Sequence, residues 1–487
     1  MTQRPEAAAR AKPQLSSSTG RAIIAAAVLG SALAYMSDDM LNVALPTVSR
    51  DLAVNVASMQ WVVNAYFVAM LSLILIAGSI GDRAGHRRTF LAGLAVFTAG
   101  ALLSAGAPGV AALVAGRAVQ GIGAAFVLAS ALALVSGSFS DGERGRAVGL
   151  YMGLTAVATA SGPVLGGLLV DVFVWRAIFL APLVFPLAAV AVTLTRVPET
   201  ERATRRRPDA VGAGLAFVTI SAFSYALIRG PGGWGRPEIL GAITVSALAG
   251  CAFLRVQQRS SSPMLPLRLF RIRSFSGGNA VTLLAYLVSA GAFFFLVVQL
   301  QTTLGYEPAA AGAALLPLYI IMLIGSPLAG RAADAVGARL PVVAGSLVLA
   351  TGVWWLSFMD GDTQFLTQIL PGLIILSIGL AMLGAPLTSA TLGSVGERDQ
   401  GIASGVNNTV GQLSGLLMIA ILPAVSGLSG EELHGAGFSA GYTTAMQVCA
   451  GLALIAAALA ALTVPSSPNQ RSDHEVRSDI DIGPRSG

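Results

Sequence analysis

Apolar residues recur along this chain in windows of about 20, separated by short segments rich in Arg, Gly, Asp and Pro. A helix of about 20 apolar residues crosses the roughly 30 Å hydrocarbon core of a bilayer. Gly and Pro inside several windows are tolerable there, because neighbouring helices satisfy the freed backbone groups. The pattern predicts fourteen membrane-spanning helices, at residues 21–46, 57–79, 89–106, 109–136, 145–170, 176–196, 210–229, 238–256, 276–299, 308–328, 340–358, 366–390, 401–425 and 440–463.

The composition agrees with this pattern, since 54 % of the 487 residues are hydrophobic and only 11 % are charged. A soluble domain of this size does not have such a composition. We therefore expect an all-α integral membrane protein. The polar residues 1–20 precede a first span that contains acids, so we expect that helix to be retained rather than removed as a signal peptide.

Basic residues are distributed unequally between the two ends of the predicted spans. With the N-terminus in the cytoplasm, the outside loops carry only Arg50, Arg176, Arg229 and Arg236, and most other basic residues fall inside. This positive-inside asymmetry predicts a multi-pass protein of the cell membrane with both termini cytoplasmic. It also accounts for the net charge of +6, and basic loops without interleaved aromatic residues do not indicate nucleic-acid binding.

A segment that follows the second span recurs after the tenth. GSIGDRAGHRR begins at residue 78, and a weaker copy, GRAADAVGAR, begins 252 positions later at residue 330, with Gly, Asp, Gly and Arg in register. Two halves in parallel tandem are a standard transporter plan. Because eight spans rather than six separate the copies, we expect two extra central helices. The predicted parts are a tail at 1–20, a six-helix half at 21–197, linkers with two inserted helices at 198–274, a second six-helix half at 275–463 and a tail at 464–487.

Asp38 and Asp39 place two carboxyl groups inside the first apolar span. An ionisable residue at membrane depth marks a functional site by default, and hydrocarbon surroundings favour the neutral acid, which brings proton exchange toward neutral pH. Adjacent helical residues point about 100° apart. We therefore expect one carboxyl group to line a cavity and the other to face a helix or the outer mouth, and the sequence leaves open which of them carries a proton.

The remaining reactive side chains do not form a catalytic or metal-binding pattern. Cys251 and Cys449 lie far apart in apolar spans, which gives neither a disulfide framework nor metal-ligand spacing. His86, His434 and His474 fall in predicted loops or the tail, so no pair has zinc-ligand spacing. We expect no metal, no cofactor and no enzymatic activity.

From Asn42 to about Ala461 the chain resembles the major facilitator superfamily, and specifically its fourteen-helix drug:proton antiporter branch. GSIGDRAGHRR resembles the signature loop between helices 2 and 3, which in that family acts as a gate. The glycines let helix ends approach, and we expect Asp82 to cap or pair with a neighbouring helix end while the arginines hold the cytoplasmic face. The resemblance implies a gating role for Gly78, Gly81, Asp82, Arg83, Gly85 and Arg87.

Two further segments carry the resemblance. LVAGRAVQGIGAA in the fourth span resembles the motif whose intramembrane arginine assists proton coupling, here Arg117, with Gln120 one turn later on the same face. Arg117 stands about eight residues into its span, which is deep for an arginine that only snorkels to the interface. In the fifth span the pattern resembles that of antiporters and implies close packing on helix 1 by Gly153, Gly162, Pro163, Gly166 and Gly167.

Helix 1 departs from the family pattern. Members of the branch usually carry an acid five residues before the Asn of NVALP, but Ser37 occupies that place here, while Asp38 and Asp39 precede Asn42 by four and three residues. The shift by one position rotates the carboxyl group by about 100°. The acid therefore faces a different partner, or the helix is locally adjusted.

Spans 9 to 14 contain no Asp, Glu, Lys or Arg as delimited, so we expect the N-terminal half to carry the coupling. An apolar pocket with few polar groups suits amphipathic organic molecules. The residues expected to contact substrate are Asn42, Asn64, Gln120, Tyr286, Gln301 and Asn407.

The predicted function is proton-coupled antiport that exports a hydrophobic or amphipathic drug or antibiotic across the cell membrane, conferring resistance or self-resistance, with the protein working as a monomer. Two alternatives stay open. A proton symporter that imports a small nutrient would need a charged or densely polar C-terminal cavity, and a polytopic membrane enzyme would need a nucleophile with its base, or a metal, at membrane depth.

Overall fold

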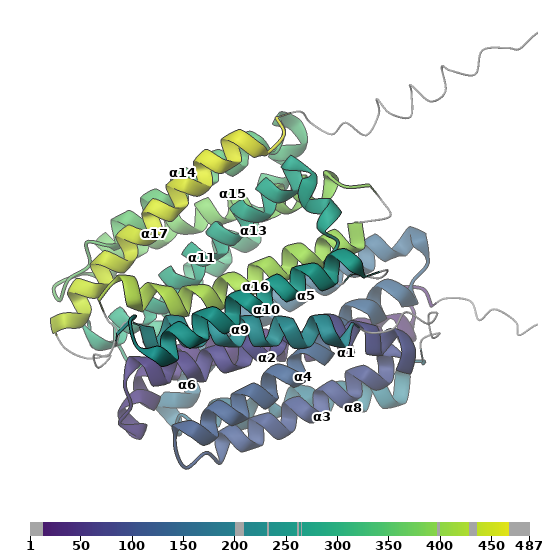
Figure 1. The fold of residues 1–487 in the computed structure, drawn as a ribbon, viewed down its shortest axis with the longest axis horizontal. Helices are drawn as coiled ribbons and strands as arrows, with labels where there is room; N and C mark the ends of the chain where they lie inside the picture. The colour runs from purple at the N-terminus through teal and green to yellow at the C-terminus, as the bar shows by residue number, and fades with distance from the viewer. Residues whose placement is uncertain are drawn as a thin grey trace, which may run out of the picture. The chain divides into compact units, whose positions relative to one another are not determined.

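The computed structural model describes residues 13–199, 209–230, 233–260, 263, 265–396, 400–427 and 436–466, and every regular element in these ranges is a helix (Figure 1). Fourteen helical segments of the described chain are long and apolar enough to cross a membrane, as the apolar pattern predicts. Each overlaps one predicted window. The ends differ by several residues in places, and the first helix runs over Ser18–Leu52 instead of 21–46.

In the first half of the chain, the fifth and sixth spans are each built from more than one helix. The fifth span is α5 and α6, separated at Ser161, and the sixth is α7, a short 3-10 helix and α8. The bounds are α1 (Ser18–Leu52), α2 (Val56–Ala84), α3 (His86–Ala105), α4 (Val110–Ser138), α5 (Asp141–Ala160), α6 (Gly162–Val172), α7 (Ala177–Leu180), η1 (Ala181–Leu183), α8 (Val184–Arg196), α9 (Ala210–Arg229) and α10 (Pro237–Arg259).

The second half begins with a short 3-10 helix, and its tenth and twelfth spans are also composite, being α12 with α13 and a π-helical turn with α15. A proline stands near the start of α12, α13 and α15. Proline is tolerated at a helix start because the backbone N–H that it lacks would have no helical acceptor there. The bounds are η3 (Leu267–Arg271), α11 (Arg273–Thr302), α12 (Pro308–Ala314), α13 (Leu316–Val336), α14 (Arg339–Leu356), η4 (Phe365–Ile369), α15 (Leu370–Gly393), α16 (Gln400–Val425) and α17 (Ala436–Thr463).

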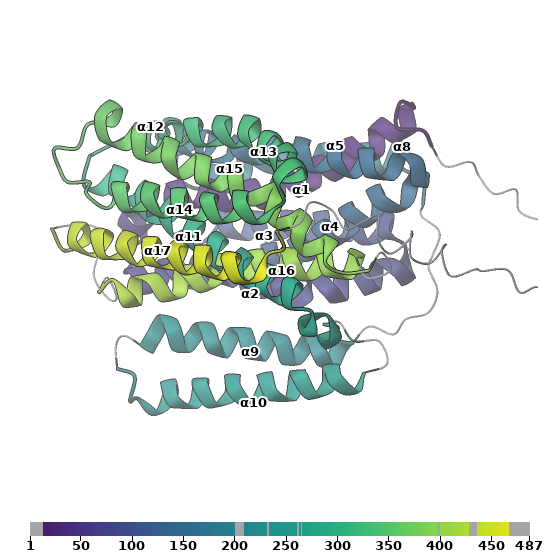
Figure 2. The ribbon, with the colours of Figure 1, turned by 90° about the horizontal axis from the view of Figure 1, so that it is seen from above.

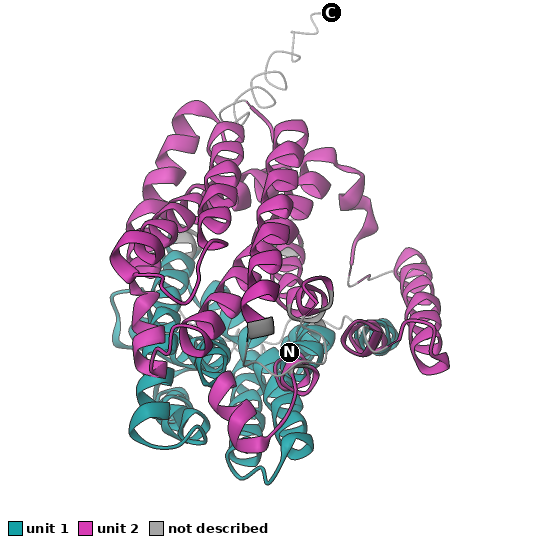
Figure 3. Cartoon of the chain, turned by 90° about the vertical axis from the view of Figure 1, so that its left-hand side faces the viewer, with its two compact units in different colours: residues 1–44, 65–220 teal, residues 45–64, 221–487 magenta. Residues whose placement is uncertain are grey.

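The chain divides into two compact units, residues 1–44 with 65–220 and residues 45–64 with 221–487 (Figure 3). The continuous helices α1 and α2 therefore contribute residues to both units. In the first unit, Phe90, Val127 and Phe139 belong to a buried apolar core. In the second, α11 packs against α16 and α17, and α14 packs against α15 and α17. The division of the sequence into two six-helix halves and a central insertion stays a prediction.

Helices α9 and α10, which the sequence predicts to be a central insertion, form an antiparallel pair (Figure 2). Only 28 % of the α9 span and 11 % of the α10 span are buried within the protein. Large apolar side chains such as Leu248, which is 67 % exposed, face outward. Such a surface is suited to contact with lipid tails rather than water.

Helices α3 and α4 approach closely because glycines line their interface. A Cβ atom on Gly100 would lie 2.9 Å from the Gly116 carbonyl oxygen, and one on Gly123 would lie 2.6 Å from the Phe97 Cα. Both distances are far shorter than an ordinary carbon contact. The small residues are therefore required for this packing.

The same glycine interface recurs between α14 and α15 in the second unit. Gly352 stands 252 positions after Gly100, and a Cβ on it would lie 2.7 Å from the Leu376 Cα. A Cβ on Gly379 would lie 2.7 Å from the Leu349 Cα, which repeats the contact of Gly123 with Phe97. The internal repeat thus extends beyond the GSIGDRAGHRR segment and its copy.

The turn inside the repeated motif is also the same in both copies. Gly85, between α2 and α3, has φ 97°, and Gly337, before α14, has φ 84°. The Gly85 N–H donates to the Gly81 carbonyl oxygen at 2.9 Å, and the Gly337 N–H donates to the Ala333 carbonyl oxygen at 2.9 Å. Side chains disfavour this left-handed conformation, so glycine is needed at both turns.

Candidate functional site

Asp38 and Arg117 form an ion pair within the membrane-spanning segments. An Nη atom of Arg117 on α4 donates to Oδ1 of Asp38 on α1 at 2.9 Å. The Arg117 side chain is fully buried, and that of Asp38 is 15 % exposed. A buried charge is strongly disfavoured without a partner, so each group stabilises the ionised form of the other.

Three neutral side chains complete the surroundings of the guanidinium. Its other Nη atom donates to Oε1 of Gln120 at 3.4 Å, and the Ser104 hydroxyl of α3 donates to the same oxygen at 3.3 Å. The Tyr66 ring of α2 lies over the guanidinium, with the Arg117 Cζ 4.4 Å from the ring centroid. Arg117 therefore contacts Asp38 of α1, Tyr66 of α2 and Gln120 of its own helix, and Ser104 of α3 bonds to Gln120. Neither Tyr66 nor Ser104 was predicted from the sequence.

Asp39 has a different environment from its neighbour. It lies beside α6, where a Cβ on Gly162 would be 3.0 Å from the Asp39 Cβ. No hydrogen bond or ion pair joins Asp39 to another described residue, and the charged group that acts on it is the neighbouring carboxyl group of Asp38. The two carboxyl groups diverge, because Asp38 binds Arg117 and Asp39 lies beside the fifth span. That one of them lines a cavity stays a prediction.

The glycines of α6 pack on α1, as the resemblance implies. Gly162, Pro163, Gly166 and Gly167 are all buried, and a Cβ on Gly166 would lie 2.7 Å from the Met40 Cα. The break before Pro163 separates α6 from α5. Gly153 differs, because a Cβ placed there meets no described atom within 4 Å. The prediction of close packing was therefore wrong at Gly153, which lies on an exposed part of α5.

The predicted gating loop is helical except at one residue. Gly78, Gly81, Asp82 and Arg83 belong to the end of α2, and Arg87 belongs to the first turn of α3, which leaves Gly85 alone between the helices. Asp82 reaches the start of α3, the next helix in the chain. Its carboxylate pairs with Nε2 of His86 at 3.1 Å, across the turn.

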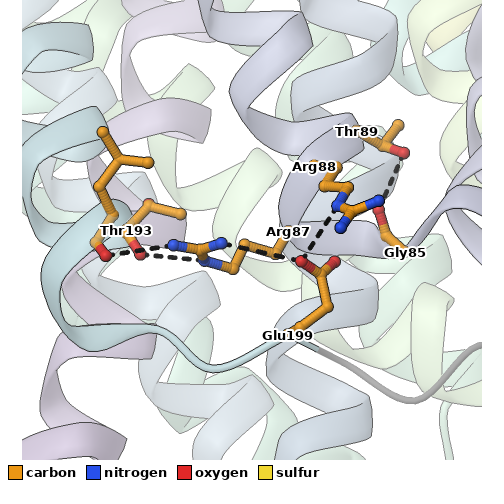
Figure 4. Close-up of polar contacts among 7 residues, drawn as sticks. Gly85, Arg87, Arg88, Thr89, Thr193 and Glu199 are labelled. Carbon is orange, nitrogen blue, oxygen red and sulfur yellow. Dashed lines mark hydrogen bonds and ion pairs between the residues drawn. The ribbon is translucent and has the colours of Figure 1, made fainter.

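Arg87 of this segment reaches the end of a further helix, α8 (Figure 4). Arg87 donates to the carbonyl oxygens of Thr193 at 3.2 Å and Leu194 at 3.1 Å in the last turn of α8. The Thr193 oxygen also accepts the Val197 N–H at 3.3 Å. Glu199 forms ion pairs with Arg87 at 3.7 Å and with Arg88 at 3.5 Å. The two guanidinium groups are favourable near the C-terminal end of α8, and Glu199, which was not predicted, pairs with both.

The residues predicted to contact substrate lie in several different environments. Gln120 is buried against Arg117, and the Asn407 amide donates to Asn279 at 3.2 Å and to Thr282 at 3.0 Å, which joins α16 to α11. Tyr286 is 54 % exposed at the middle of α11, and Gln301 lies in the last turn of that helix.

Two asparagines in this set have amide atoms without described partners. Asn64 is fully buried on α2, and neither its oxygen nor its nitrogen has a hydrogen-bond partner among the described residues. The Asn42 oxygen likewise has none there. Buried polar atoms are almost always paired, so both amides are suited to bind water or substrate, and a substrate-contact role for the set stays a prediction.

Among the aligned positions of α3 with α14 and of α4 with α15, the arginine occurs in the first copy of the repeat and not in the second. The two glycine interfaces align the copies residue by residue. The contact of Gly100 with Gln120 corresponds to the contact of Gly352 with Leu376. The contact of Gly116 with Ser104 corresponds to the contact of Gly372 with Leu356. By the same register, Leu373 occupies the position of Arg117, and it is fully buried. Leucines thus replace Arg117, its partner Gln120 and Ser104, which bonds to Gln120, in the second copy.

The chain belongs to the major facilitator superfamily, since the sequence model described as "Major Facilitator Superfamily" matches residues 27–419. It is 35 % identical over 437 residues to the cephamycin export protein CmcT of Amycolatopsis lactamdurans, covering 88 % of this chain and 89 % of that protein. It is 34 % identical over 399 residues to the multidrug resistance protein Stp of Mycobacterium tuberculosis, covering 82 % and 74 %.

A solved structure shows the same fold. The crystal structure of the human organic anion transporter MFSD10 (TETRAN) is similar with a TM-score of 0.61 at 17 % identity, covering 90 % of this chain and 99 % of that one. At this identity the likeness concerns the fold. The chain is therefore a multi-pass membrane protein with a transporter fold of this superfamily.

Proposed function

We propose that this protein is a proton-coupled antiporter that exports hydrophobic or amphipathic compounds, including antibiotics, across the cell membrane. The observation that carries the proposal is the Asp38–Arg117 pair with an unpaired Asp39 next to it, inside the membrane-spanning segments. The similarity to CmcT and Stp, an export protein and a multidrug resistance protein, supports the direction of transport and the class of substrate.

Charge balance distinguishes the two carboxyl groups. Asp38 and Arg117 together are neutral, so an ionised Asp39 would leave one uncompensated negative charge in the hydrocarbon region. Asp39 therefore exchanges the transported proton, while Asp38 is the counter-ion that keeps Arg117 in place. A cationic or protonated substrate would bind when Asp39 is ionised and would leave when a proton from outside neutralises it.

The proton gradient is strong enough to drive export. One proton moving inward through about 100 mV releases about 2.3 kcal/mol, and one pH unit adds about 1.4 kcal/mol. The sum supports an outward concentration ratio of a neutral compound of about 500-fold. Leucines at the second-repeat positions favour this reaction over nutrient symport, which was expected to need charged groups in the C-terminal half.

The remaining parts of the proposal follow from sequence. Both termini face the cytoplasm, as the arginine distribution predicts, and the two rocking halves belong to one chain, so a monomer is sufficient. No cofactor or metal is required for this cycle, since proton exchange and substrate binding use the side chains themselves.

Export can be measured in inside-out membrane vesicles with an acidic lumen, using ethidium and cephamycin as probes. The wild-type protein should accumulate probe and release lumenal protons. Asp39→Asn should abolish accumulation while the folded protein still binds probe. Asp38→Asn should instead lower the melting temperature, because removing one partner of a buried ion pair costs about 3–5 kcal/mol.

A matched control is Asp362→Asn, which changes an exposed loop carboxyl group in the same way. It should leave export unchanged. Gradient-driven accumulation by Asp39→Asn at the wild-type rate would contradict the assignment of the proton to Asp39. Absence of any gradient dependence in the wild-type protein would contradict antiport itself.

A further inference from the structure

Tyr66 joins the two partners of the ion pair although it is not a charged residue. Its ring lies over the Arg117 guanidinium, with 4.4 Å between Cζ and the ring centroid, and its hydroxyl donates to the Ala34 carbonyl oxygen at 2.8 Å. Ala34 stands four residues before Asp38 on α1, one helical turn away. Tyr66 therefore contacts both the cation and the turn of α1 that carries the anion.

We infer that Tyr66 is a positioning residue that holds the Arg117 guanidinium against Asp38 and so sets the pH range in which the transporter works. The inference rests on the proposed antiport function. An aromatic face attracts a guanidinium, most strongly away from water, and Tyr66 is 2 % exposed while Arg117 is fully buried. Because the ring binds the flat face of the cation, the N–H groups at its edge stay directed at Asp38 and Gln120.

The approach of α2 to α4 that this contact needs depends on a glycine. Gly121 stands one turn after Arg117 on α4, and a Cβ there would collide with the Tyr66 carbonyl oxygen and lie 3.0 Å from the Ala69 Cβ. With Gly121 the backbone of α2 lies directly on α4, so the Tyr66 ring reaches the guanidinium. The position of the Tyr66 ring is thus fixed by α4 on one side and by the Ala34 carbonyl oxygen of α1 on the other.

The titratable and charged groups around the pair come from three helices. Asp38, Asp39 and Tyr35 lie on α1, Tyr66 on α2 and Arg117 on α4, while Ser104 of α3 and Gln120 of α4 are neutral. The guanidinium is the positive group that keeps Asp38 ionised. When the guanidinium moves away, it no longer compensates the charge of Asp38, so that like charge acts more strongly on the neighbouring Asp39, which then takes up its proton at a higher pH.

The test compares the pH dependence of export in variants that separate the ring from the hydroxyl. Tyr66→Phe keeps the aromatic face and removes only the bond to Ala34, so its pH profile should stay within a few tenths of a unit of the wild-type profile. Tyr66→Leu and Tyr66→Met remove the aromatic face. Their half-maximal points should move to higher pH by about one unit, with Kd for ethidium changed less than about threefold.

Tyr151→Leu is the matched control for the loss of a buried tyrosine. Tyr151 is 5 % exposed, and its hydroxyl is 2.8 Å from the Ser31 hydroxyl of α1, but its ring covers no guanidinium in the described structure. This variant should lower the melting temperature without moving the pH profile. If Tyr66→Leu does not fold, Tyr66→Met still provides the comparison, because the flexible methionine side chain fills irregular gaps in a core.

Two results would overturn the inference while leaving antiport intact. One is a wild-type pH profile in both Tyr66→Leu and Tyr66→Met, and the other is a shift in Tyr66→Phe as large as theirs. In an Arg117→Gln background, Tyr66→Leu should have no further effect on the profile. A wild-type protein with no dependence on the proton gradient would instead count against the proposed function.

Discussion

Replacement of Gly166 by leucine tests the contact of α6 with α1 directly. A Cβ at this position would lie 2.7 Å from the Met40 Cα and 3.0 Å from the Met40 carbonyl oxygen. Normal contacts of carbon atoms are about 3.5–4.0 Å. Since the obstructing atoms belong to the α1 backbone and not to a flexible side chain, α1 and α6 must separate by about 1 Å.

A separation of this size would break the ion pair that lies on the same turn of α1. Met40 follows Asp38 by two residues, and the Asp38–Arg117 distance is 2.9 Å. A displacement of about 1 Å takes this distance beyond the usual hydrogen-bond limit of about 3.2 Å. Overpacking of this kind costs about 1–3 kcal/mol, so the protein should still fold and insert, but it should lose export and leak protons.

The assay measures ethidium accumulation and proton leak in inside-out vesicles, with the amount of inserted protein as reference. Gly166→Ala adds a single methyl group and should be milder than Gly166→Leu. Gly153→Leu is the control, because a Cβ at Gly153 meets no described atom within 4 Å, and it should behave as the wild type. Wild-type export and resistance in Gly166→Leu would refute the packing argument.

Two further predictions concern the turn between α2 and α3. Asp82→Asn should reduce the transport rate without weakening equilibrium binding of ethidium in detergent, because Asp82 is exposed on the gating segment; a large loss of affinity would argue against a gating role. Gly85→Ala should lower the melting temperature and the export rate, since φ is 97° and the new methyl group would collide with the Glu199 carboxylate. A left-handed alanine costs about 1–3 kcal/mol. Gly78→Ala is its control, with no described atom within 4 Å of a new Cβ, and equal melting temperatures for the two variants would exclude the predicted strain.

The number of spans and the depth of the charged residues were predictable from the sequence because both depend on local properties. An apolar window of about 20 residues is suited to the bilayer whatever its neighbours are, and all fourteen windows contain helices in the described structure. Asp38, Asp39 and Arg117 stood out for the same reason, since a charge within such a window is costly by itself. The tandem repeat was partly visible, and glycines 252 residues apart, such as Gly100 and Gly352, would have extended it.

The tertiary structure decided which groups meet. Asp38 and Arg117 are 79 residues apart, and a rotation of α1 by one residue would have presented Asp39 to the guanidinium instead. Tyr66, Ser104 and Glu199 escaped notice because nothing in the sequence near each of them marks its partner. Gly153 and Gly166 look alike in sequence, but only Gly166 faces α1. The reason is physical: a bilayer selects helices one at a time by their hydrophobicity, whereas partners are selected by the rotation and close approach of helices that are distant in the chain.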